Sequence, residues 1–117
     1  MTVIVNGTEV DFGDCCAVIE NGSTLVPARA LFETLGAQVS WNGETQTVYA
    51  ERDWRLISFK IGDSKIYVDG QVKELGLSVK IIDSVAYIPL RSMCDALDYK
   101  LSWDEETKSA EVSYASF

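Results

Sequence analysis

Histidine is absent from this 117-residue sequence, which removes the side chain on which much acid–base, nucleophilic and metal-site chemistry depends. A Ser-His-Asp or Cys-His catalytic arrangement cannot form, and no phosphate loop, dinucleotide fingerprint or zinc-ligand spacing takes its place. The acidic turn at residues 104–106 offers oxygen ligands for weak calcium binding, but it lacks the alternating spacing and the glycine of an EF-hand loop. We predict that the chain is not an enzyme and uses no metal or other cofactor.

Basic residues are also scarce, with 10 Lys and Arg against 18 Asp and Glu and a net charge of −8. This balance argues against nucleic-acid partners, which require a basic footprint, and against attraction to an anionic membrane surface. No apolar run approaches the length of a membrane span. No basic segment leads into an apolar one, so we expect neither a signal peptide in this chain nor membrane insertion.

Cysteine is too rare for a disulfide framework, because three residues leave at least one thiol unpaired. Cys15 and Cys16 are adjacent on a predicted strand and would therefore point to opposite faces. Cys94 falls on the apolar stripe of a predicted helix. We expect three free thiols, with at least one in the core.

What the sequence does contain is a motif written twice with a constant offset of 62 residues. Val-Pro-Ala-Arg in the first half corresponds to Ile-Pro-Leu-Arg in the second, and Val-Ser-Trp-Asn corresponds to Leu-Ser-Trp-Asp. The matching residues are Pro27/Pro89, Arg29/Arg91 and Trp41/Trp103. The repeated units run over about residues 3–50 and 66–114. A unit of this length cannot bury its apolar face alone, so we predict one domain over residues 1–117.

The local pattern predicts an α+β fold, an antiparallel meander sheet packed against two short helices. Asn-Gly and Asp-Gly pairs mark hairpin turns between alternating runs. The helices are predicted over residues 27–35 and 89–97, each with proline at its first position and an i, i+3, i+4, i+7 apolar stripe. Strands are predicted near residues 3–6, 8–12, 15–20, 23–26, 38–42, 46–52, 55–61, 64–69, 71–75, 78–83, 85–88, 99–103 and 108–114.

The repeated tryptophans and arginines have structural and functional interpretations. Trp41 and Trp103 end a strand and would cap the core, with the indole N–H donating to a carbonyl. Arg29 and Arg91 lie in a first helical turn, where a cation opposes the helix dipole, so we predict a nonlocal partner and a role as structural anchor. The alternative is that the two arginines bind an anionic ligand.

A separate surface candidate is the pair Trp54 and Leu56, predicted on the strand face opposite Ile57 and Phe59. If the latter face the core, Trp54 lies at or near the surface and could stack on a sugar ring or fill a protein pocket. The structural alternative is that Trp54 covers a sheet edge or packs under a loop.

The doubled motif resembles the copper amine oxidase N-terminal-like domain over nearly the whole chain. The matching residues are Val26, Pro27, Arg29, Leu35, Gly36, Val39, Trp41, Asn42 and Thr45, then Ile88, Pro89, Arg91, Leu97, Leu101, Trp103, Asp104 and Thr107. The second half departs at Asp98-Tyr99, where the family usually has Gly-Ala. The resemblance implies an accessory or stalk domain of bacterial secreted and cell-surface proteins. The three-histidine copper site of the oxidase cannot exist in a chain without histidine.

We therefore predict a noncatalytic accessory domain, a spacer or protein-interaction module of a larger bacterial secreted or cell-surface protein. Its expected partners are other domains of that protein or a component of the cell envelope. The alternative is a carbohydrate-binding module of the cell envelope. An extracellular or surface location is implied by the resemblance alone.

Overall fold

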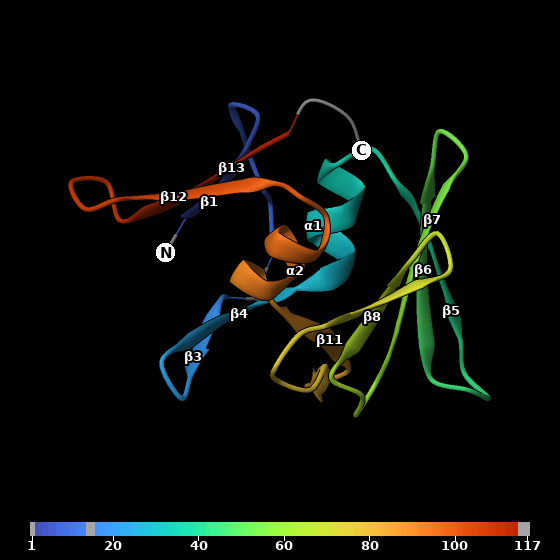
Figure 1. Ribbon diagram of the computed structural model, residues 1–117. Coiled ribbons are helices and arrows are strands. Elements are labelled where there is room, and N and C mark those ends of the chain that lie inside the picture. Colours follow the sequence, from blue (N-terminus) through green and yellow to red (C-terminus); the bar gives the residue numbers. More distant parts are fainter. Residues whose placement is uncertain (1, 14–15, 115–117) are drawn as a thin grey trace.

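Three small β-sheets surround two short helices in the computed structural model, which describes residues 2–13 and 16–114 (Figure 1). The helices are α1 (Ala28–Thr34) and α2 (Leu90–Ala96). The strands are β1 (Thr2–Val5), β2 (Thr8–Glu9), β3 (Val18–Glu20), β4 (Ser23–Pro27), β5 (Gln38–Asn42), β6 (Thr47–Arg52), β7 (Arg55–Lys60), β8 (Lys65–Val68), β9 (Gln71–Glu74), β10 (Lys80–Ile82), β11 (Val85–Pro89), β12 (Lys100–Asp104) and β13 (Ser109–Ser113). The α+β class expected from the sequence is therefore observed.

The central sheet brings the two copies of the proline motif together. Its strand order is β10-β11-β4-β3, and the inner strands β4 and β11 run antiparallel. Val26 lies opposite Ile88, while Pro27 lies opposite Tyr87. Val26 and Ile88 are themselves 62 residues apart, so each motif pairs with its own counterpart at the centre of the molecule.

The sequence predicted a single antiparallel meander, but the strands of the described residues form three sheets. Of the two outer sheets, β5-β6-β7-β8-β9 is an antiparallel meander and β12-β13-β1-β2 is not. In the sheet β12-β13-β1-β2, strands β1 and β13 pair in parallel, with Val3 opposite Ala110. A parallel pair needs a long crossover, and here nearly the whole domain separates the two strands. Alternation within each strand carries no information about such a distant partner.

Each helix is shorter than predicted and begins one residue later. Pro27 and Pro89 are the N-cap residues at the ends of β4 and β11, with φ of −59° and −64°, and not the first helical residues. Both helices have seven residues and end before a left-handed residue, Gly36 at φ +84° and Asp98 at φ +59°. Asp98 therefore ends α2 with the conformation that Gly36 gives to α1.

The helices are held by one core that all three sheets share. The predicted stripes are buried: Leu31, Phe32 and Leu35 are at most 1% exposed, and Met93, Cys94 and Leu97 at most 2%. The ring of Phe32 stacks on that of Phe59 in β7, with 5.7 Å between centroids. Helices of seven residues are unstable alone, so this packing keeps them folded.

The hairpins confirm the turn predictions and add two more turns. Asn6-Gly7, Asn21-Gly22 and Asp69-Gly70 have positive φ at both residues, as a type I′ turn requires. Asp53-Trp54 and Asp83-Ser84 have the same conformation without a glycine, and the sequence pattern did not mark them.

Two of the three cysteines lie among the described residues, and both are free thiols: Cys16 is exposed and Cys94 is buried. Cys15 lies outside the described residues. Neither helix in the described part of the chain is long and apolar enough to cross a membrane.

Candidate functional site

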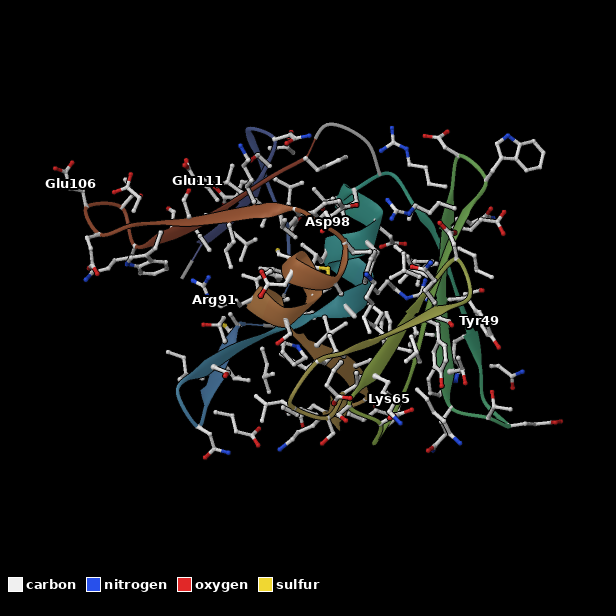
Figure 2. All side chains as sticks on the ribbon, in the orientation of Figure 1. Tyr49, Lys65, Arg91, Asp98, Glu106 and Glu111 are labelled. Atoms are coloured by element: carbon white, nitrogen blue, oxygen red, sulfur yellow. The ribbon has the colours of Figure 1, made fainter. Side chains whose placement is uncertain are left out.

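The arginines at the helix starts have no nonlocal hydrogen-bond or ion-pair partner among residues 2–13 and 16–114, so the predicted anchor role is wrong. The side chain of Arg29 is 57% exposed, and its one ion pair with the described residues is local, at 3.8 Å from Glu33 on the next helical turn. Arg91 is also exposed, and its guanidinium forms no ion pair or hydrogen bond with residues 2–13 or 16–114. Figure 2 shows Arg91 projecting outward from the start of α2.

The repeated tryptophans are only partly buried. Trp41 is 44% exposed and Trp103 is 45% exposed, so neither ring closes the core as the sequence suggested. Neither indole N–H donates to a carbonyl among the described residues. Each tryptophan lies two residues beyond a half-buried residue on the same strand face, Trp41 beyond Val39 and Trp103 beyond Leu101. The strands β5 and β12 therefore carry their tryptophans past the core edge and into solvent.

Two grooves on the surface are each lined by the exposed arginine and the exposed tryptophan of one half of the chain. The Arg91 groove is bounded by the start of α2, by β12 and by the β3–β4 turn, and it encloses about 260 Å³. Its lining includes Arg91, Trp103, Ser102 and Ser23. The Arg29 groove is bounded by α1, β5 and the β10–β11 turn, and it encloses about 310 Å³. Its lining includes Arg29, Trp41, Ser40 and Ser84.

The two grooves are built from matching positions. The lining residues at an offset of 62 come from three regions: Ala28/Leu90 and Arg29/Arg91 from the helices, Val39/Leu101, Ser40/Ser102, Trp41/Trp103 and Val48/Ala110 from strands β5, β6, β12 and β13, and Ser84/Gly22, Val85/Ser23 and Ala86/Thr24 from the hairpin turns and the first residues of β11 and β4. Helix and strands come from one half of the chain and the turn from the other. The antiparallel pairing of β4 with β11 explains this exchange, because it brings each turn beside the opposite helix.

Each groove has a single charged lining residue, and that residue is an arginine. Among the residues that the structure describes, no carboxylate lines either groove, although the chain as a whole has a net charge of −8. Glu33, beside Arg29, stands outside the lining at 3.8 Å from the guanidinium. The arrangement can therefore take an anionic group against the guanidinium and a flat apolar surface against the indole.

The Asn21-Gly22 turn was predicted from the sequence, but its place in a groove was not, and neither were the Asp83-Ser84 turn and the partnership between the halves. Asn21-Gly22 and Asp83-Ser84 stand at the same 62-residue offset, which is the signal that could have found them. Sequence offset alone does not show that a turn reaches the other half.

Trp54 and Leu56 lie apart from both grooves. Trp54 occupies the β6–β7 turn, not a strand, with φ +68° and 102% exposure. The alternative that it covers a sheet edge or packs under a loop is therefore wrong. Leu56 is 42% exposed and borders a shallow hollow with Tyr49 and Glu51. Whether Trp54 and Leu56 form a contact surface stays a prediction.

Two buried side chains have perturbed acidities and lie away from the grooves. Burial, with a smaller contribution from Asp95 and against the opposing effect of Arg91, raises the pKa of Cys94 to about 12. Burial, with the neighbouring Tyr114, also raises the pKa of Tyr99 to about 12. The Tyr99 hydroxyl has no hydrogen-bond partner among the described residues. A thiol with this pKa is protonated at neutral pH and is a poor nucleophile.

The acidic turn after β12 uses its first carboxylate for its own backbone. Asp104 Oδ1 accepts hydrogen bonds from the N–H groups of Glu106 at 3.0 Å and Thr107 at 3.4 Å. Asn42 makes the same turn after β5 by accepting from Glu44 and Thr45. Within the part of the chain that the structure describes, no group of three or more cysteine and acidic residues could hold a metal ion.

Comparison with known proteins identifies a family and one distant relative. The family model described as Copper amine oxidase N-terminal domain matches residues 4–112. A protein of Brevibacillus choshinensis named "Protease inhibitor" is 26% identical over 104 residues, which is 87% of this chain. The chain spans 31% of the length of that relative.

Proposed function

Since the chain belongs to the copper amine oxidase N-terminal domain family, we propose that it is a noncatalytic accessory domain of a larger bacterial secreted or cell-surface protein. The grooves support this proposal, because each offers an arginine and a tryptophan for binding, while the described lining residues include no general base that could activate the lining hydroxyl groups. The Brevibacillus relative supports the proposal that the domain belongs to a larger protein, because the chain spans only 31% of that relative's length.

The residues do not fit the copper that the family name suggests. Protein copper sites use imidazole, thiolate or thioether ligands, and this chain has no histidine. Of the two described cysteines, Cys94 is fully buried and Cys16 is exposed, so they cannot share one ion without rearrangement. We propose no step that involves copper.

We also propose that residues 3–50 and 66–114 are structural repeats related through the β4–β11 pair. The opposition of Val26 and Ile88 supports this, as does the matching lining of the two grooves. One domain would then present two copies of one surface site.

Between a spacer and an interaction module, the exposed arginines and tryptophans favour interaction. A spacer needs no half-exposed indole, whereas tryptophan and arginine dominate binding energy at protein interfaces. The second candidate is a carbohydrate-binding module of the cell envelope, favoured by the small groove volumes of about 260 and 310 Å³.

Cell fractionation tests the accessory role. An antibody against the 117-residue chain should detect a much longer polypeptide in the envelope or culture-medium fraction of the producing cells. Detection of a free cytoplasmic polypeptide of this length would contradict the proposal. A cytoplasmic marker protein measured in the same fractions controls for lysis.

A further inference from the structure

We propose that each groove binds one carboxylate-bearing sugar unit, so that the domain binds an acidic polysaccharide at two equivalent sites. This inference rests on the second proposed function, carbohydrate binding, and names its ligand class. The sites are the Arg91 groove and the Arg29 groove, which share nine lining positions at the 62-residue offset and identical arginine, serine and tryptophan residues at three of them.

The arginine selects the carboxylate. A guanidinium presents a planar fork of donors that matches the two oxygens of a carboxylate. The Arg91 guanidinium has no ion pair or hydrogen bond within residues 2–13 and 16–114, and Arg29 has only the long contact of 3.8 Å to Glu33. Each is the single charge among the described residues that line its groove, so an anionic ligand meets no carboxylate there, although the net charge of −8 opposes a polyanion at longer range.

The tryptophan selects the ring. About half of each indole is exposed, at 44% and 45%, in the same groove as the arginine. A pyranose ring has an apolar C–H face and a polar rim, which suits a flat aromatic side chain with polar neighbours. Ser23, the first residue of β4, lines the Arg91 groove, and Ser84, in the β10–β11 turn, lines the Arg29 groove; each comes from the opposite half and can hydrogen-bond to hydroxyl groups.

The volume limits the ligand to about one ring in each groove. Pockets that take drug-sized molecules enclose about 300–1,000 Å³. The grooves, at about 260 and 310 Å³, lie at the lower limit of that range. An acidic peptide could place one carboxylate on the arginine, but it would cover the indole only where it also carries a proline or aromatic ring. A repeating acidic glycan brings both groups in every unit.

Calorimetric titration with a galacturonic acid oligosaccharide tests the inference directly. The folded chain should bind two oligosaccharides per molecule. The methyl ester of the same oligosaccharide keeps the rings and removes the charge. Its affinity should be at least about tenfold lower, as expected for loss of a charged hydrogen bond. Poly-glutamate of equal length, which keeps carboxylates and lacks rings, should also bind at least about tenfold more weakly.

Matched variants assign the binding to the grooves. Arg29→Gln and Arg91→Gln should each reduce the stoichiometry from two to one, and the double variant should lose at least about tenfold in affinity. Trp41→Ala with Trp103→Ala should give a similar loss. Lys60→Gln is the control, because Lys60 is an exposed cation on β7 outside both grooves. Circular dichroism verifies that each variant is folded.

Three results would overturn the inference: no binding of the acidic oligosaccharide, equal binding of ester or poly-glutamate, or unchanged binding by the double arginine variant. Equal binding of poly-glutamate would assign the grooves to acidic protein partners. Cell fractionation does not depend on the ligand. If the titration shows no binding but the polypeptide is found in the envelope fraction, the glycan proposal is rejected and the accessory role is kept.

Discussion

The two outer sheets are alike at their edges and differ at their centres. In one, β13 lies directly beside β1 in parallel, whereas in the other β7 separates β6 from β8. Because β7 is antiparallel to both neighbours, β6 and β8 also run in the same direction. The sheet β5–β9 is thus the four-stranded arrangement with one strand inserted.

The position of β7 shows how the order of elements along the chain determines which strands pair. β6 and β8 are joined through β7, which folds back between them by two tight turns. β13 and β1 come from opposite ends of the described chain, so no connecting strand lies between them and they pair directly. The difference follows from the order of elements and not from the sequence of the paired strands.

Several positions related by the 62-residue offset differ in residue type, whereas the arginine and the tryptophan of the grooves do not. Phe32 corresponds to Cys94, Ala37 to Tyr99 and Gly36 to Asp98, yet Arg and Trp occupy the same groove positions in both halves. Packing tolerates compensated changes of volume. Packing explains only part of the match at the half-exposed tryptophans and none at the exposed arginines, which agrees with the proposed binding role.

The largest expected contrast is at the paired core positions. Phe32→Ala should lower the free energy of unfolding by about 3–5 kcal/mol, because it removes a fully buried ring stacked on Phe59. Cys94→Ala should cost much less, since only one heavy atom is lost. Urea denaturation of both variants measures the difference, and equal costs would show that the two positions pack alike.

Alkaline pH should destabilise the protein through the second half. The Cys94 pKa is about 12 in the folded state against an ordinary 9.0, so only the unfolded state loses this proton between those values. The free energy of unfolding therefore falls as pH rises, by about 2–3 kcal/mol from this group at pH 11. Stability of Cys94→Ala should decline less steeply over that range, and parallel pH curves would contradict the assignment.

The tryptophans should contribute equally and moderately. Trp41→Ala and Trp103→Ala should each cost about 2 kcal/mol, roughly half the value for a fully buried tryptophan, because both are about half exposed. Trp54→Ala is the matched control, since that ring is 102% exposed and should cost almost nothing. A cost for Trp54→Ala as large as for the other two would mean that exposure does not govern these effects.

The two helix ends should respond with opposite signs. Gly36→Ala should destabilise by about 1–2 kcal/mol, because φ is +84° and the new Cβ would stand 2.9 Å from Arg52 Nη1. Asp98→Gly should stabilise by about 0.5–1 kcal/mol by placing the preferred residue at φ +59°. Thermal denaturation measures both, and destabilisation by Asp98→Gly would show that its side chain has a compensating contact.

The smallest effects belong to the arginines. Arg29→Lys and Arg91→Lys should each change the free energy of unfolding by less than about 0.5 kcal/mol, as expected for exposed charges. Lys60→Arg provides the surface control. A loss well above that of the control would restore the anchor role that the structure contradicts.

Local structure followed from the sequence because its causes are local. The alternating runs, the Asn-Gly turns and the i, i+3, i+4, i+7 stripes each depend on neighbouring residues, and the structure places strands and helices close to the expected ranges. The lack of a nonlocal partner for Arg29 and Arg91 among the described residues could not be predicted in this way, because it is a property of the whole surface.

By itself, the sequence determined the α+β class, the two helices with their buried faces, and the family through its doubled motif. Only the tertiary structure decided the parallel pairing of β1 with β13, the half-exposure of Trp41 and Trp103, and the grooves that combine both halves. Periodicity reports which face of an element is apolar. It does not report which distant element covers that face, or how far a side chain extends beyond the edge of the core.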